Sequence, residues 1–250
     1  MQLAGAVALI TGASSGIGAA TAIALAKARA RLILTGRDEA ALARVAGRTG
    51  GVAMPADLEQ PGAPEALAAA ALATYGRVDL LVCNAGSGWA GPTARMPAAD
   101  VARLVTLNLL APIQLARAML PGMTARGHGQ LVFVSSIAGV TGARQEAVYG
   151  ATKAALNNLA DSMRYELAGS GVGVSVVVPG VVDTPFFSRR GRPYERVWPR
   201  PVDANRVAAA IADAATRGLP VVYVPGWLGF PAWLHGAAPG LFRRLATRFG

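Results

Sequence analysis

The sequence of 250 residues is poor in the residue types that build disulfides and metal sites. Its single cysteine, Cys83, excludes an internal disulfide and a cysteine-based metal site. The two histidines, His128 and His235, are too few for an ordinary histidine-ligated metal, so we expect no metal. Lysine is equally scarce, since only Lys27 and Lys153 occur. A lysine within a motif is therefore stronger evidence for a function than it would be in a lysine-rich chain.

Long hydrophobic runs are also missing. No stretch of about 18 apolar residues is free of glycine, proline and charge, so we expect no transmembrane helix. The first residues lack the basic and apolar regions of a secretory signal, which makes the cytoplasm the expected location. Hydrophobic residues make up 53% of the chain and charged residues 15%, and this balance favours a folded protein over a disordered one.

Acidic residues are in deficit, with 14 against 24 basic residues and a formal net charge of +10. Almost all of the positive charge is arginine, dispersed along the chain and accompanied by no recognised nucleic-acid-binding motif. We therefore expect no nucleic-acid partner.

Residues 1–35 have the order strand, glycine-rich turn, helix, strand. Residues 6–11 (AVALIT) and 31–35 (RLILT) are short apolar runs typical of buried strands, and an alanine-rich helix between them extends to about residue 28. Glycines in the turn permit a close approach of the backbone, and the start of the helix offers free N–H groups to a pyrophosphate. The pattern predicts a dinucleotide phosphate cradle, with a plain tight turn as the alternative.

Tyr149 and Lys153 are four residues apart, so they share one face of a helix. The reference pKa of a phenol is about 10, and a nearby ammonium group stabilises the phenolate and lowers that pKa. If Ser136 reaches the same place, its hydroxyl can hold a substrate oxygen while Tyr149 transfers a proton. The alternative is an ordinary exposed helical pair, a spacing that is common by chance.

The Thr-Gly-x-x-x-Gly-x-Gly spacing of residues 11–18, followed by the Tyr-x-x-x-Lys pair, resembles the short-chain dehydrogenase/reductase family. The likeness covers nearly the whole chain and recurs at independent positions, which include Asp57-Leu58, Asn84-Ala85-Gly86, Asn108, Ser136, Pro179-Gly180 and Thr184. It implies an α/β, Rossmann-like doubly wound fold of about seven parallel strands with helices on both faces. We expect one domain, residues 1–250.

The resemblance also implies the roles of the site residues. Tyr149 is the general acid or base, Lys153 lowers its pKa and binds the nicotinamide ribose, Ser136 orients the substrate oxygen, and Asn108 helps to hold a water that relays protons. The implied cofactor-binding residues are Gly12, Ser14, Ser15, Gly16, Ile17, Gly18, Arg37, Asp57, Leu58, Asn84, Ala85, Gly86, Tyr149, Lys153, Pro179, Gly180, Val182 and Thr184. Two positions depart from the family pattern: Cys83 replaces a frequent asparagine, and Arg29 a frequent glycine.

The end of the second strand bears on the choice between NAD and NADP. Gly36 stands in the position of the carboxylate that holds the ribose of NAD, and Arg37 follows it. A guanidinium group suits the 2′-phosphate of NADP, so we expect NADP(H) over NAD(H). The alternative is a solvated arginine, its charge blunted by the neighbouring Asp38.

Residues 186–201 have poor periodicity and lie where the family closes over its substrate. An irregular insert beside an active site indicates a lid, and its aromatic residues, with Trp89, indicate an apolar pocket. Its arginines either steer an anionic substrate or are simply solvated.

The tail, residues 226–250, is apolar and basic, and no acidic residue occurs from Ala214 onward. On a helical wheel Leu241, Phe242, Leu245 and Phe249 gather on one side, and Arg243, Arg244 and Arg248 lie towards the other. Such a helix either packs on the protein or a second subunit, or lies on an anionic membrane, which would make the protein peripheral.

The sequence thus predicts an NADP-dependent oxidoreductase that interconverts a ketone or aldehyde and an alcohol, with an apolar substrate (a lipid, a steroid-like or an acyl-derived molecule). The alternative is a protein that binds NADP(H) without turnover, as a sensor or scaffold. Members of the family are commonly dimers or tetramers, so a homo-oligomer is expected.

Overall fold

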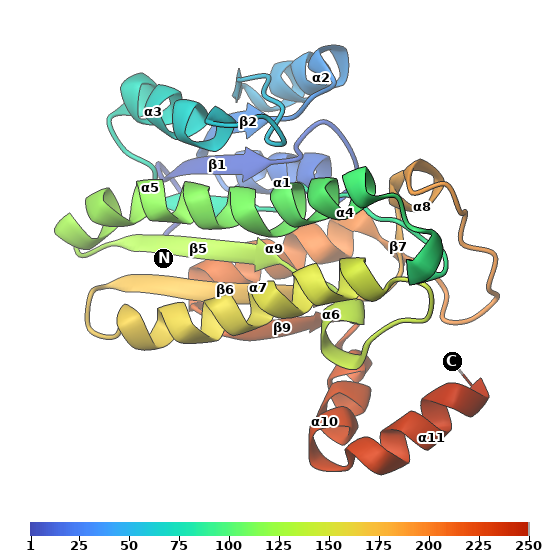
Figure 1. Ribbon diagram of the computed structural model, residues 1–250. Helices are drawn as coiled ribbons and strands as arrows, with labels where there is room; N and C mark the ends of the chain where they lie inside the picture. Colours follow the sequence, from blue (N-terminus) through green and yellow to red (C-terminus); the bar gives the residue numbers. More distant parts are fainter. Residues whose placement is uncertain (250) are drawn as a thin grey trace.

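The computed structural model describes residues 1–249 and the side chains of residues 1–247. A seven-stranded, wholly parallel sheet with the order β3-β2-β1-β4-β5-β6-β9 forms its centre (Figure 1). The strands are β1 (Val7–Thr11), β2 (Arg31–Thr35), β3 (Val52–Ala53), β4 (Leu80–Cys83), β5 (Gly129–Val134), β6 (Val172–Pro179) and β9 (Val221–Val224). The order reverses between β1 and β4, which is where ligands bind in such sheets. The predicted doubly wound fold is confirmed.

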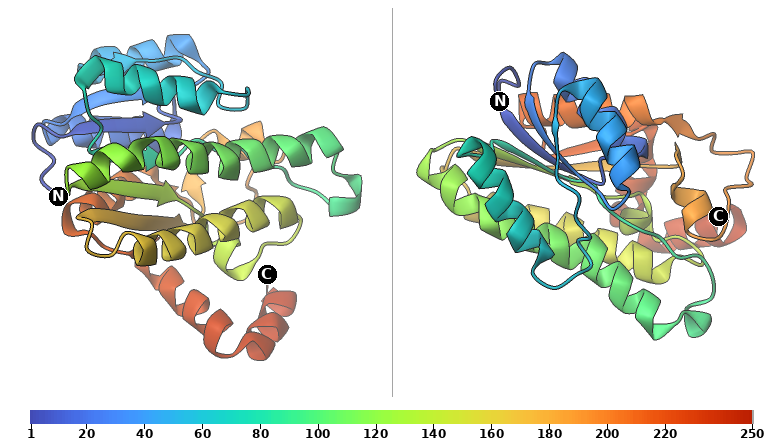
Figure 2. Two further views of the ribbon diagram at one scale, coloured as in Figure 1. Left: turned by 60° about the vertical axis from the view of Figure 1, so that its left-hand side comes forward. Right: turned by 90° about the horizontal axis from the view of Figure 1, so that it is seen from above.

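Helices cover both faces of the sheet (Figure 2). On one face lie α1 (Gly16–Lys27), α2 (Glu39–Thr49) and α9 (Ala204–Arg217). On the other lie α3 (Ala63–Tyr75), α5 (Ala111–Ala125) and α7 (Ala147–Glu166). Each face has its own core of buried aliphatic side chains, which explains why β1, β4 and β5 are buried along their whole length.

One continuous helix, residues 98–125, comprises α4 (Ala98–Val105), a π-helical turn η2 (Thr106–Leu110) and α5. By length and composition alone it could cross a membrane. Here its α5 part packs on the sheet through Leu115 and Met119, so it serves as a core helix. The π-helical turn occurs at the predicted catalytic residue Asn108, and such turns are frequent at functional sites.

The shorter elements follow the carboxyl ends of the strands or the last strand. They are η1 (Thr93–Arg95), α6 (Ala138–Thr141), β7 (Val182–Asp183), α8 (Phe186–Arg189), β8 (Val202–Asp203), η3 (Gly226–Leu228), α10 (Gly229–Ala237) and α11 (Pro239–Phe249). Strands β7 and β8 pair in parallel and close the base of the 186–201 segment. In Figures 1 and 2, α10 and α11 extend away from the sheet.

The amino ends of the strands are joined by the fully buried Asp79. Its Oδ2 accepts a hydrogen bond of 2.9 Å from the Val7 N–H, and its Oδ1 accepts one of 2.8 Å from Arg77 Nε. The Gln130 N–H donates to the Asp79 carbonyl oxygen at 2.8 Å. One residue therefore links β1, β4 and β5, and Arg77 compensates its buried charge.

Three local features complete the description of the fold. Strand β3 comprises only Val52 and Ala53, although the Met54 N–H still donates to the Leu34 carbonyl oxygen at 2.8 Å and the Ala56 N–H to the Gly36 carbonyl oxygen at 3.3 Å. Arg29 has φ 61°, the left-handed conformation in which it costs about 1 kcal/mol relative to glycine. Cys83 is buried, as expected for a small apolar substitute.

Candidate active site

A cleft of about 1810 Å³ opens at the carboxyl ends of the strands. Most of the predicted site residues line it: Gly12, Ser14, Ser15, Gly16, Ile17, Arg37, Leu58, Asn84, Ala85, Gly86, Ser136, Tyr149, Lys153, Pro179, Gly180, Val182 and Thr184. Gly18, Asp57 and Asn108 are not part of its lining. Two distant motifs, the glycine-rich turn and the Tyr-Lys helix, therefore face one cavity.

Ser136 and Tyr149 meet at the wall of this cleft. Ser136 follows β5, Tyr149 lies in the first turns of α7, and both are buried. Burial raises the pKa of Tyr149 to about 12, a hydrogen bond with Ser136 opposes that rise, and the Glu146 carboxylate adds to it. The neighbouring Ser135 instead donates to the Lys153 carbonyl oxygen at 3.1 Å, so Ser136 is the hydroxyl available to a substrate.

Lys153 lies one turn further along α7, also buried. Its Nζ donates to the Val134 carbonyl oxygen at 2.9 Å and lies 5.9 Å from the centroid of the Tyr149 ring. Burial lowers the pKa of Lys153 to about 8, and the Cys83 thiol group opposes this shift. The expected lowering of the Tyr149 pKa by Lys153 is not seen, because the ammonium group faces a backbone carbonyl and is not among the groups that shift the phenol.

Asn108 is fully buried behind the cleft. Its Oδ1 accepts from the Ser87 N–H at 2.9 Å, and its Nδ2 donates to the Ser87 carbonyl oxygen at 2.9 Å and to Thr152 Oγ1 at 3.2 Å. The amide side chain is thus committed to holding the loop after β4 against α7. The structure supports a positioning role for this side chain.

The glycine-rich turn is packed against the end of β4. A Cβ on Gly12 would lie 2.9 Å from the Ala85 Cα, and one on Gly18 would lie 2.2 Å from the Gly12 carbonyl oxygen. Asn84 Nδ2 donates to the Thr11 carbonyl oxygen at 2.9 Å and fixes the turn from the β4 side. Gly18 is therefore required for close packing of α1 on the turn, which is why it lies outside the cleft lining.

The residues present fit a nicotinamide dinucleotide. The turn leads into the N-terminus of α1, whose dipole favours phosphate. Two buried hydroxyls of cleft-lining residues, Thr35 Oγ1 and Ser87 Oγ, have no hydrogen-bond partner among the described residues. A ligand rich in hydroxyl and phosphate oxygens offers such partners. Among residues 1–247, no cluster of histidine, cysteine, aspartate or glutamate side chains could hold a metal ion.

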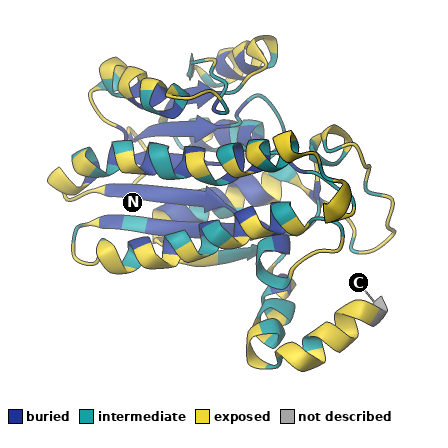
Figure 3. Cartoon of the chain, in the orientation of Figure 1, coloured by how far each residue is buried: buried dark blue, intermediate teal, exposed yellow. Residues whose placement is uncertain are grey.

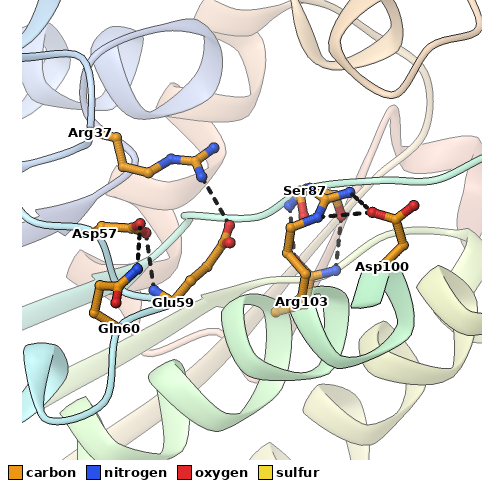
Figure 4. Close-up of polar contacts among 8 residues, drawn as sticks. Arg37, Asp57, Glu59, Gln60, Ser87, Asp100 and Arg103 are labelled. Atoms are coloured by element: carbon orange, nitrogen blue, oxygen red, sulfur yellow. Dashed lines mark hydrogen bonds and ion pairs between the residues drawn. The ribbon is translucent and has the colours of Figure 1, made fainter. Parts of the chain in front are cut away.

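Arg37 has a partner that the sequence did not reveal. Its Nη1 lies 3.0 Å from Glu59 Oε1, across the start of the loop after β3 (Figure 4). Asp38 is not that partner, because its Oδ1 caps α2 by accepting from the Ala41 N–H at 2.9 Å. Asp57 lies beside this pair and accepts from the Glu59 N–H at 3.1 Å, so it shapes the loop. The guanidinium group of Arg37 is half exposed and faces the cleft.

The 186–201 segment covers the cleft with aromatic and basic side chains. The Phe186 ring centroid lies 5.4 Å from that of Tyr149, and Phe187 and Tyr194 continue the aromatic row. Arg190 forms an ion pair with Glu146 at the start of α7. Arg189 Nη1 donates to Ser15 Oγ at 3.0 Å, which joins the segment to the phosphate turn. Sequence reasoning missed Glu59, Glu146 and the Arg189 contact, because these pairings span long stretches of chain and leave no periodic signal.

Comparisons with known proteins agree with this geometry. The family model for the short chain dehydrogenases matches residues 6–195. The chain is 39% identical to the ketoacyl reductase HetN of Nostoc sp. over 185 residues, which are 72% of this chain and 64% of that protein. This chain thus spans less than two thirds of that relative's length.

Two solved structures share the fold over nearly the whole chain. A short-chain dehydrogenase from Sphingobium yanoikuyae, in complex with NADPH, is 32% identical, with a TM-score of 0.83 over 95% of both chains. A short-chain dehydrogenase/reductase from Burkholderia phymatum, in complex with NAD, is 27% identical, with a TM-score of 0.85 over 96% of both chains.

Proposed function

The chain belongs to the short-chain dehydrogenase/reductase family of oxidoreductases, and from this premise we propose that it is an NADP-dependent reductase of ketones on apolar, acyl-derived molecules. The observation that carries the proposal is the meeting of Ser136, Tyr149 and Lys153 with the phosphate turn in one cleft. A protein that only sensed the nucleotide would have no need of this set of proton-transfer groups.

The bound nicotinamide supplies the hydride. Ser136 Oγ holds the carbonyl oxygen of the substrate, and Tyr149 donates its proton to that oxygen. With a pKa of about 12, the buried phenol is fully protonated at neutral pH and so can act as the acid. Lys153, with a pKa of about 8, is mainly cationic at neutral pH and lines the same cleft, where its ammonium group can bind the ribose of the nicotinamide. Oxidation of an alcohol uses the same groups in reverse.

The preference for NADP rests on Arg37. The position before it is Gly36, so no carboxylate at the end of β2 repels a 2′-phosphate. A 2′-phosphate would have to share the Arg37 guanidinium group with the Glu59 carboxylate. The preference for NADP over NAD should therefore be weaker than it would be if Arg37 had no carboxylate partner. The relatives include proteins in complex with NADPH and with NAD.

The substrate class rests on the walls of the cleft and on one relative. Phe186, Phe187 and Tyr194 offer an apolar wall beside Tyr149. Arginines 189, 192 and 196 line the same cleft and suit an anionic end group such as that of an acyl thioester. HetN, named a ketoacyl reductase, makes a ketoacyl chain the first substrate to try.

The experiment is loss of NADPH absorbance with a panel of β-ketoacyl thioesters, steroid ketones and simple aldehydes. We expect turnover of the ketoacyl thioesters and a lower KM for NADPH than for NADH. Tight NADPH binding without turnover of any carbonyl compound would instead indicate the sensor or scaffold.

We also expect a cytoplasmic homo-oligomer, a dimer or tetramer. The outer faces of α5 and α7 form a shallow groove lined by Ile113, Ala116, Leu120, Leu159 and Met163, among others, and two such faces can pack on each other. Light scattering on the purified full chain measures the assembly directly.

A further inference from the structure

The end of the chain forms a helical hairpin, η3 with α10 and α11 (residues 226–249), which we call the C-terminal hairpin. Helix α10 packs against α6, while α11 contacts α10 and is exposed along most of its described length (Figure 3). Its inner side faces the cleft, because His235, Phe242 and Arg243 belong to the cleft lining. The His235 and Phe242 rings meet edge to face at 5.1 Å and hold the two helices together. The hairpin therefore has a defined position and a defined inner side.

Large apolar side chains lie on the outer side of the hairpin. Phe230 and Trp233 are 67% and 64% exposed, and their rings stack at 6.1 Å. Trp233 is two residues before His235, which places the two side chains roughly 200° apart around the helix axis. Leu241 and Leu245, one turn apart on α11, are also exposed. Together these four side chains expose apolar surface to water on one part of the hairpin, which is characteristic of a binding surface.

The exposed aromatic surface extends to the 186–201 segment. Trp198 stacks on Trp227 of η3 with the ring centroids 5.4 Å apart, and both indoles are exposed. Val197, beside Trp198, is exposed as well. Indole rings at the edge of an apolar surface are characteristic of the membrane interface, where one side of the ring meets lipid and the other meets water.

The charged side chains of the hairpin have one sign. Asp213 is the last acidic residue of the sequence, and Arg217, Arg243, Arg244 and Arg248 follow it. Arg243 and Arg244 lie on α11 itself, and no carboxylate of the hairpin is available to neutralise them. A second copy related by a two-fold axis would bring these like charges towards each other, which disfavours self-association through this face. An anionic lipid surface attracts them.

We propose that the C-terminal hairpin is a docking surface for an anionic lipid bilayer. Phe230, Trp233, Leu241 and Leu245 enter the interface, and Arg244, on the same side of α11 as the two leucines, contacts the headgroups. In this arrangement the outer side of the hairpin contacts the membrane, and its inner side remains turned towards the cleft. The side chains of Arg248 and Phe249 lie outside the described residues and are not part of the proposal.

The test is co-sedimentation of the full chain with vesicles of phosphatidylcholine containing about 30 mol% phosphatidylserine, against vesicles of phosphatidylcholine alone. We expect the chain to pellet with the anionic vesicles, and salt at about 0.5 M to release much of it. The double variant Phe230→Ser/Trp233→Ser should lower the bound fraction at least about tenfold, and Arg244→Gln should lower it about fivefold. Tyr165→Ser is the matched control, because Tyr165 is an aromatic residue 81% exposed on α7 and should not affect binding.

A full chain that stays in the supernatant with anionic vesicles overturns the proposal. If it does so, and light scattering shows that Phe230→Ser/Trp233→Ser breaks an oligomer, the surface belongs to a second copy of the chain. Binding reduced equally by Tyr165→Ser would also overturn it, since that loss would not be specific to the hairpin. Far-ultraviolet circular dichroism of each variant separates loss of binding from loss of folding.

Discussion

Arg190 and Glu146 form an ion pair that fastens the 186–201 segment to the start of the catalytic helix α7. The side chains are 8% and 19% exposed, so each charge depends on the other for compensation. The same guanidinium group lies 4.5 Å over the Phe187 ring. Arg190 thus makes both an ion pair and a cation–π contact within this region.

Glu146→Gln should loosen this segment. We expect trypsin to cleave after Arg189 or Arg196 about fivefold faster, which corresponds to roughly 1 kcal/mol of lost local stability. Glu146→Gln/Arg190→Gln should lose less than the sum of the two single variants, because it leaves no unpaired charge. Asp213→Asn is the control: it breaks an exposed pair with Arg217 and should leave cleavage unchanged. Equal cleavage of Glu146→Gln and the parent chain would contradict the role of this pair.

Tyr149→Phe should retain NADPH binding while turnover falls at least ~10²-fold, the usual scale for loss of a general acid. The ring and its packing against Phe186 remain, so the fold is preserved. Cofactor fluorescence measures binding, and absorbance of NADPH measures turnover. Undiminished turnover would remove Tyr149 from the mechanism.

The pH dependence of the two directions should differ. Because the pKa of Tyr149 is raised to about 12, the phenol keeps its proton, and reduction should stay nearly constant from about pH 5 to pH 7, below the range in which Lys153, with a pKa of about 8, loses its charge. Oxidation needs the phenolate, so its kcat/KM should rise with pH over the same range. A reduction rate that falls tenfold per pH unit within this range would show that bound cofactor lowers the pKa of Tyr149.

Affinity for NADPH should change in opposite directions when Arg37 and Glu59 are replaced. Arg37→Ala should raise the Kd for NADPH about tenfold or more and leave that for NADH unchanged, because only NADPH carries the 2′-phosphate. Glu59→Gln should lower the Kd for NADPH, since it removes the competing carboxylate. Equal effects of Arg37→Ala on both cofactors would assign Arg37 to the loop rather than to the phosphate.

The glycine-rich turn should tolerate no added methyl group at Gly18. A Cβ there would meet the Gly12 carbonyl oxygen at 2.2 Å, so Gly18→Ala should abolish cofactor binding and lower Tm. Gly47→Ala is the matched control, because nothing lies within 4 Å of its Cβ and alanine in a helix gains up to ~1 kcal/mol over glycine. Normal NADPH binding by Gly18→Ala would refute this account of the turn.

Much of the fold follows from local patterns. Apolar runs such as 31–35 have the length and burial of parallel strands, and the glycines of residues 12–18 fix where a phosphate can approach. The Tyr149–Lys153 spacing correctly placed both residues at one cleft, because helix geometry is local. The end of the strand after Gly51 did not follow from such a pattern, because this strand comprises only Val52 and Ala53.

The electrostatics of the site did not follow from spacing. The four-residue interval between Tyr149 and Lys153 places both on α7, but it cannot say that Val134 offers a carbonyl oxygen to the ammonium group. The pairing of Arg37 with Glu59 depends on the loops after two different strands. Such contacts join positions far apart in the chain, and charged side chains at exposed ends of elements carry no hydrophobic periodicity from which to predict them.

Asp79 gives the sheet two unequal ends. At the amino ends of the strands, Asp79 joins β4 to β1 through its buried carboxylate and to β5 through its backbone carbonyl oxygen, so replacement of its side chain should destabilise the whole domain. At the carboxyl ends, the loops meet around an open cleft and depend little on that junction. Substrate range can therefore diverge by exchange of the loops while the opposite end keeps the scaffold intact. Libraries for new specificity are best confined to the cleft side of this chain.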